Sequence, residues 1–182
     1  MAKAIGMIEF KTVSAGITAA DQMVKAADVE ILEAQVVCPG KYIALIAGEL
    51  SAVKAAVEVG INTRSEEYID SFVLGNPDES IFAAIYGSAV IENVNALGVL
   101  ETYDASAIIV AADVAAKTAQ VTLIELRIAK GMCGKSYMLI TGEIAACEAA
   151  IEKAKLSVGD TGMFLDSSVI ARPDEQIIKN IV

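Results

Sequence analysis

Four consecutive residues between two short apolar segments could bind a metal: Cys38, Pro39, Gly40 and Lys41. A cysteine thiolate binds iron and other soft metals. Proline restricts the backbone and glycine permits left-handed conformations, so the sequence predicts a tight turn with Cys38 at its tip. A lone cysteine is more often an unreactive structural residue. One cysteine per chain is also a poor site by itself, because iron–sulfur clusters usually take four thiolates.

The other two cysteines have different surroundings. Cys133 lies in the segment KGMCGK, directly before a second Gly-Lys pair, where the first segment has Pro39. An extra metal ligand and a redox-sensitive thiol are alternatives there, but we expect a passive turn residue. Cys147 lies among alanines at helical spacing and is expected in the core.

Composition excludes several classes of function. The chain has 182 residues, a net charge of −10 and no histidine, which removes Ser-His-Asp and Cys-His catalysis and His-ligated zinc. We expect no enzyme, since no nucleophile is paired with a base. No stretch is rich in Lys or Arg, so nucleic acid is not an expected partner. Apolar segments are too short to span a membrane, and the first ten residues lack an apolar signal segment, so we expect a cytosolic protein.

The chain contains the same sequence twice. The segment AIGMIE (Ala4–Glu9) returns as ALGVLE (Ala96–Glu101), GKYIALIAGE returns as GKSYMLITGE, and DSFVLGNPDE returns as DSSVIARPDE. The second copy has gained residues before its Gly-Lys and again before its Pro-Asp-Glu, where loops are expected. The sequence therefore predicts two domains, residues 1–92 and 93–182.

Each copy predicts the order strand, helix, strand, strand, helix, strand. In the first copy the expected elements are strands Ile5–Phe10, Ile31–Val37, Tyr42–Gly48 and Phe72–Leu74, and helices about Gly16–Ala27 and Leu50–Asn62; in the second they are strands Leu97–Thr102, Val121–Ala129, Tyr137–Gly142 and Val169–Ile170, and helices about Ser106–Ala119 and Ile144–Leu156. A short helix follows each Pro-Asp-Glu. We expect an α+β fold of two tandem ferredoxin-like domains, each an antiparallel sheet with both helices on one face.

The repeated blocks AIGMIE, AADQMVKAADVEIL, GKYIALIAGELSAVKAAVEVG and VLGNPDE resemble the bacterial microcompartment shell domain. The resemblance covers nearly the whole chain, in the non-permuted order, and is strongest to the tandem-domain iron–sulfur shell proteins of propanediol-utilisation compartments. It implies a homotrimer that mimics a hexamer, tiles into shell facets within the cytoplasm, and contacts other shell proteins and encapsulated redox enzymes.

The resemblance also assigns roles to residues. It implies that Cys38 from three chains holds one shared [4Fe–4S] cluster, with a non-protein fourth ligand, for electron transfer across the shell. It implies a central pore lined by the two turns: Pro39, Gly40 and Lys41 from the first, and Lys130, Gly131, Met132, Cys133 and Gly134 from the second.

Three more residues are expected at the perimeter of the assembly. Lys25 and Lys117 occupy equivalent positions at the ends of the first helices, where a solvated charge near a helix C-terminus is the simpler interpretation. The resemblance places them at the edge between neighbouring trimers, and we prefer this because the residue recurs in both copies. Arg172 resembles a second edge residue, but its counterpart is Asn76.

Two other functions remain open. The same pore without a cluster would pass small metabolites, with Cys38 and Lys41 merely lining it. A ligand-binding regulatory module built on a ferredoxin-like repeat would instead be a soluble dimer that forms no sheets.

Overall fold

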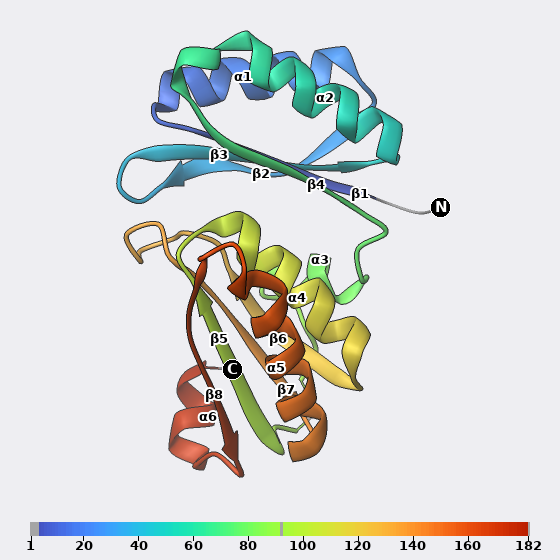
Figure 1. The fold of residues 1–182 in the computed structure, drawn as a ribbon, viewed down its shortest axis with the longest axis vertical. Helices are drawn as coiled ribbons and strands as arrows, with labels where there is room; N and C mark the ends of the chain where they lie inside the picture. Colours follow the sequence, from blue (N-terminus) through green and yellow to red (C-terminus); the bar gives the residue numbers. More distant parts are fainter. Residues whose placement is uncertain (1–3, 92, 182) are drawn as a thin grey trace. The chain divides into compact units, whose positions relative to one another are not determined.

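The computed structural model describes residues 4–91 and 93–181 of the chain (Figure 1). By packing, the chain divides into two compact units, the first ending at Pro77 and the second beginning at Asp78. None of the helices in these residues has the length and apolar character that crossing a membrane requires.

The first unit confirms the predicted order of elements. It consists of β1 (Ala4–Phe10), α1 (Val13–Ala26), β2 (Val29–Val37), β3 (Lys41–Gly48), α2 (Leu50–Thr63), a short 3₁₀ helix (Ser65–Glu67) and β4 (Tyr68–Gly75). The strands pair antiparallel in the order β2-β3-β1-β4, which is the ferredoxin-like order. Both long helices lie on one face of this sheet (Figure 1).

The second unit repeats this arrangement. It consists of α3 (Ser80–Ile85), β5 (Ala96–Thr102), α4 (Ala105–Thr118), β6 (Val121–Arg127), β7 (Ser136–Gly142), α5 (Ile144–Gly159), β8 (Phe164–Ala171) and α6 (Glu175–Ile181). The strand order is β6-β7-β5-β8, the same as in the first unit. Helix α3 packs against β6 and α4, so it belongs to this unit by packing although it follows the last strand of the first repeat. The predicted domain boundary at residue 92 lies outside the described residues and stays a prediction.

The last strand of each unit is longer than predicted. The sequence predicts strands only at Phe72–Leu74 and Val169–Ile170, whereas β4 spans Tyr68–Gly75 and β8 spans Phe164–Ala171. Polar residues interrupt the apolar pattern in both strands. They are tolerated because β4 and β8 are edge strands that pair on one side only, with β1 and β5.

Small residues allow the helices to approach the sheets closely. In the first unit the core between sheet and helices includes Ile8, Phe10, Met23 and Ile46, all with 0% exposure, together with several alanines. A Cβ atom added at Gly6 of β1 would lie 2.6 Å from a methyl group of Val53 on α2. Such a contact is too short for a real Cβ, so only glycine permits this packing. Helix α2 and the sheet of the first unit therefore lie in close contact.

Side-chain caps fix where the first helix of each unit begins. Thr12 accepts a hydrogen bond from the Ala15 N–H at 3.4 Å, and Asp104 accepts one from the Ala107 N–H at 2.8 Å. Each cap satisfies a backbone donor that the first turn of a helix leaves unpaired. The two helices therefore start at equivalent places although the capping residue differs.

The second face of the sheet in the second unit is also partly covered. Leu97, Ile124 and Leu139 form a small apolar cluster there, and Ile91, Val94 and Ile181 pack against it with other partly buried residues. Residues just before β5 and the end of α6 thus shield the face that α4 and α5 leave open. The sequence predicts helices on one face of the sheet only. The packing of residues on the second face was not predicted.

An ion pair links β1 to the start of β3. The Nζ of Lys41 lies 2.6 Å from Oε1 of Glu9, and the exposed fractions of the two side chains are 26% and 6%. Glu9 pairs with Ile43 across the strands, so Lys41 is its diagonal neighbour on the same face. A buried carboxylate without a partner is costly, which makes this pair a stability element of the first unit.

We expect the Glu9–Lys41 pair to be strongly coupled in unfolding experiments. Lys41→Met should lower the free energy of unfolding by about 2 to 4 kcal/mol, because it leaves Glu9 buried without its cation. The double variant Glu9→Met/Lys41→Met should recover most of this loss, since no charge then remains buried. Urea unfolding at equal protein concentration measures both. A double variant that loses the sum of the two single losses would show that the residues are not coupled.

Candidate functional site: the Cys38 turn and its counterpart

The predicted turn joins β2 to β3 through Cys38, Pro39 and Gly40. Cys38 is partly exposed, Pro39 and Gly40 are exposed, and the Cys38–Pro39 peptide bond is cis. The N–H of Gly40 donates to the carbonyl of Val37 at 2.9 Å, which closes the turn. Gly40 has φ of +97°, and a Cβ added there would meet nothing within 4 Å. Glycine is therefore needed for its backbone conformation rather than for space.

Two groups at this turn that could bind an anion already interact with other residues of the chain. The Gly40 N–H bonds to Val37, and the Lys41 ammonium bonds to Glu9. The positive charge of Lys41 is thus balanced inside the chain. Sequence reasoning missed Glu9, although a glutamate recurs at the equivalent position, Glu101. The Cys38 thiol remains the group at this tip that can bind a soft metal.

The counterpart turn in the second unit is longer and differently built. It joins β6 to β7, and it contains four residues with positive φ: Ala129 (51°), Gly131 (72°), Cys133 (54°) and Gly134 (90°). The Cys133 side chain is exposed. A non-glycine residue in the left-handed region is uncommon, so the conformation of Cys133 is imposed by its surroundings. One of the two insertions predicted from the repeat comparison lies in this turn.

The metal-binding side chains in the described part of the chain are not clustered. Within residues 4–91 and 93–181, no group of three or more His, Cys, Asp or Glu side chains is arranged to hold a metal ion. Cys147 is fully buried, its thiol lies 4.0 Å from the carbonyl of Ala96, and burial, followed by the charge of Glu143, raises its pKa. Cys147 is therefore a core residue, as predicted. Cys38 is a single, partly exposed thiol at a turn, which suits one ligand of a site shared between chains.

The two predicted edge lysines have the same geometry in both units. Lys25 lies in the last turn of α1, 2.6 Å from Asp21, and Lys117 lies in the last turn of α4, 2.8 Å from Asp113. Each pair has the i, i+4 spacing of a helix surface. Their environments differ, because the side chain of Asp21 is 47% exposed and that of Asp113 only 9%. Asp113 also accepts a hydrogen bond from the Asp78 N–H at 2.8 Å.

Arg172 is exposed and directly precedes Pro173. Its backbone is left-handed, with φ of 53°, and Asn76 before Pro77 has φ of 54°. The two copies therefore share a backbone position but not a side chain. Asparagine tolerates this conformation better than arginine does.

A cluster of charged and aromatic side chains on β6 and β7 was not predicted from the sequence. The Tyr137 hydroxyl donates to Glu125 at 2.7 Å, Arg127 Nη2 lies 2.6 Å from Glu125, and the guanidinium lies 5.7 Å from the centre of the Tyr137 ring. Burial and then the hydrogen bond to Glu125 raise the pKa of Tyr137 to about 12. The first repeat has Gln35 and Ile43 at the positions of Arg127 and Tyr137, so this cluster is particular to the second unit.

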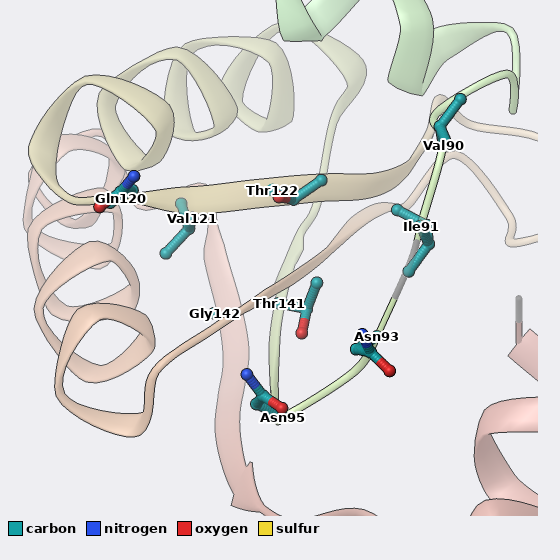
Figure 2. A pocket seen from close by; sticks show the side chains of 9 residues that line it. All are labelled: Val90, Ile91, Asn93, Asn95, Gln120, Val121, Thr122, Thr141 and Gly142. Carbon is teal, nitrogen blue, oxygen red and sulfur yellow. The ribbon is translucent and has the colours of Figure 1, made fainter.

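A pocket of about 450 Å³ opens beside β6 and β7 in the second unit (Figure 2). The described residues that line it are uncharged: Val90, Ile91, Asn93, Asn95, Gln120, Val121, Thr122, Thr141 and Gly142. Figure 2 shows Thr141 of β7 in the lining of this pocket, together with Ile91 and Asn93. The Thr141 hydroxyl is buried and has no hydrogen-bond partner among the described residues. The lining supplies neither a nucleophile with a base nor a metal-binding group, and it contains none of the predicted site residues.

We expect Thr141→Val to stabilise the chain by about 1 kcal/mol. The substitution removes a buried hydroxyl whose hydrogen bond is not made, and that hydroxyl costs free energy on folding. Thr122→Val on the neighbouring strand is the control, because Thr122 is exposed and its hydroxyl is solvated. Thermal and urea unfolding of the three proteins measure the effect. A less stable Thr141→Val variant would mean that the hydroxyl is hydrogen-bonded in solution.

Comparison with known proteins agrees with this architecture. The family model "BMC domain" matches residues 4–77 and again 96–173. The shell protein PduT of Citrobacter freundii is 35% identical over 100% of this chain and 99% of its own length. The carboxysome assembly protein CcmO of Synechococcus elongatus is 28% identical over 99% of this chain and 69% of its own length.

Two solved structures have the same fold. A crystal structure of a microcompartment protein from Desulfitobacterium hafniense matches with a TM-score of 0.95 and 39% identity, covering 98% of this chain and 99% of that one. The fused permuted hexameric shell protein MSM0275 matches with a TM-score of 0.66 and 20% identity, covering 88% and 85% of the two chains. The second likeness shows the fold alone. Both units of the chain carry the strand order and helices of the matched domain, and the chain belongs to the BMC-domain family as a tandem-domain member.

Proposed function

We propose that this chain is a structural shell protein of a bacterial microcompartment. The observation that carries the proposal is the presence of two complete BMC domains in one chain, together with full-length similarity to proteins named as shell components. A chain with two copies of one fold can form a ring of pseudo-sixfold symmetry from three subunits. Such rings would tile into facets together with other shell proteins, at the boundary of a compartment within the cytoplasm.

The Cys38 turn is the proposed site of a shared cofactor. Three chains around one axis would each supply the Cys38 thiolate to a [4Fe–4S] cluster, with a non-protein group as fourth ligand. The partly exposed thiol at a closed turn, and the lack of a one-chain metal site in the described residues, support a ligand set drawn from several chains. When bound, the cluster would accept and release single electrons. Encapsulated redox enzymes would be the partners of such a site.

The residues of the turn have separate roles in this proposal. Pro39 restricts the direction of Cys38, and Gly40 provides the left-handed residue that closes the turn. Lys41 holds Glu9 and thereby fixes the start of β3. Cys133 and its neighbours Lys130, Gly131, Met132 and Gly134 are proposed to line the same pore without binding the cluster.

Cys38→Ser tests the cofactor. Protein purified without oxygen should be brown, with about four irons and four sulfides per three chains, and Cys38→Ser should lose the colour and the iron while its mass in solution is unchanged. Cys133→Ser, which removes the exposed thiol of the other turn, should keep both. A colourless, iron-free wild type with intact Cys38 thiols would favour the metabolite pore without a cluster.

Lys25 and Lys117 are proposed to form the edges between neighbouring rings, with Arg172 as an additional contact. Lys25→Ala should weaken the two-dimensional sheets seen by electron microscopy of concentrated protein, without unfolding the chain, because Lys25 is exposed and its pair with Asp21 contributes little to stability. Lys54→Ala, at an exposed position on α2, is the control. Normal sheets from Lys25→Ala would contradict the edge assignment, and a dimer that forms no sheets would favour a ligand-binding module.

A further inference from the structure

The pocket beside β6 and β7 contains a buried hydroxyl group that the fold does not use. Thr141 is 5% exposed, and its hydroxyl oxygen has no hydrogen-bond partner among the described residues. Other buried polar side chains in that part of the chain are bonded: Glu9 and Asp113 are paired with lysines, and the hydroxyls of Thr102 and Ser136 bond to the backbone. Because buried polar groups are almost always satisfied, the Thr141 hydroxyl calls for a partner from outside the chain.

The strand register places a second hydroxyl group beside the first. Thr122 of β6 is the direct cross-strand partner of Thr141 on β7, so the two side chains lie on the same face of the sheet. In the first unit the equivalent pair is Glu30 opposite Ala47. The scaffold is therefore compatible with other side chains at both positions. The two threonines are a feature of the second unit and not a requirement of the fold.

The mouth of the pocket carries three amide side chains: Asn93, Asn95 and Gln120, all exposed. The Asn95 amide donates to Glu143 at 3.4 Å, which leaves its carbonyl oxygen able to accept. Amides and hydroxyls both donate and accept hydrogen bonds. Among the described residues, the lining has no charged and no aromatic side chain. It therefore offers hydrogen bonds of both kinds, without a counter-ion for a charged ligand or a ring on which a planar base could stack.

We propose that this pocket binds a small uncharged polyol. A hydroxyl group of the ligand bonds to Thr141 at the buried end, and hydroxyls on neighbouring carbons bond to Thr122 and to the amides at the mouth (Figure 2). The carbon chain of the ligand contacts Val90, Ile91 and Val121, which supply the apolar part of the lining. The inference goes beyond the proposed shell function and rests neither on ring formation nor on the cofactor.

The size of the pocket favours a polyol over a single bound water. A volume of about 450 Å³ lies within the range of roughly 300 to 1,000 Å³ that is usual for small-molecule sites, whereas one water takes up about 30 Å³. A polyol presents a hydroxyl on each carbon, so it displaces several waters and still replaces their hydrogen bonds. A linear sugar alcohol of the size of sorbitol meets both requirements.

Three ligands with the same carbon skeleton test the chemical class. Sorbitol is uncharged, gluconate carries a carboxylate and glucamine carries an ammonium group. Titration of the full chain by saturation-transfer NMR should give a saturable signal for sorbitol, with a dissociation constant on the order of 1 mM, and binding of the two charged ligands at least about 10-fold weaker. NMR is chosen because polyols also stabilise proteins by being excluded from their surfaces, which would affect a thermal assay without binding.

Three valine substitutions of equal shape locate the site. Thr141→Val should weaken sorbitol binding about 10-fold, because it removes the buried hydroxyl, and Thr122→Val should weaken it about 3-fold. Thr18→Val is the matched control, since Thr18 is exposed on α1 of the first unit and should bind sorbitol like wild type. Loss of binding in Thr141→Val cannot be mistaken for unfolding, because the same substitution is expected to stabilise the chain.

Three results would overturn the proposal. A sorbitol signal that rises linearly without saturation would show that the pocket holds only solvent. Binding by Thr141→Val with the affinity of wild type would place the ligand elsewhere. Equal affinity for gluconate or glucamine would show that the site does not select uncharged molecules. None of these results bears on ring or sheet formation, so the proposed shell function stands or falls separately.

Discussion

A four-stranded sheet with both helices on one face leaves a second face and two edges to be covered, and this requirement organises the chain. In the second unit the open face is shielded by residues just before β5 and by the end of α6, and α3 packs at β6. These covering segments lie outside the βαββαβ core and connect or follow the repeats. In the first unit β2 keeps apolar residues exposed. Two sheets of the same topology are therefore covered unequally in this chain.

Buried charge is the second constraint, and in both units it is met by pairing. Glu9 is held by Lys41, and Asp113 is held by Lys117 and by a backbone N–H. A buried carboxylate needs such partners because its desolvation is otherwise uncompensated. Lys41 therefore acts within the fold, whereas the thiol beside it is not tied into the fold in this way. This structural cation lies only three positions along the chain from the partly exposed thiol of Cys38.

Duplication followed by divergence explains why the two turns differ. The shared scaffold keeps β2–β3 and β6–β7 as equivalent hairpins, but one carries Cys38 in a short closed turn and the other carries Cys133 in a longer segment with several left-handed residues. A ring of identical single domains would repeat one turn six times. In the proposed ring of three chains, Cys38 would stand at every second turn, which matches the three protein ligands of the proposed cluster.

The sequence by itself determined the repeat, the order of strands and helices, the ferredoxin-like class and the core position of Cys147, because these follow from local periodicity and from spacing between matching segments. The sequence underestimated the lengths of β4 and β8, because polar residues in these edge strands interrupt the apolar pattern. The tertiary structure alone decided that Lys41 pairs with Glu9, that Tyr137, Glu125 and Arg127 meet, and that α3 is buried while its copy α6 is not. These outcomes depend on how strands and helices are placed next to one another in the fold, and local patterns carry no information about which surface a finished helix will contact.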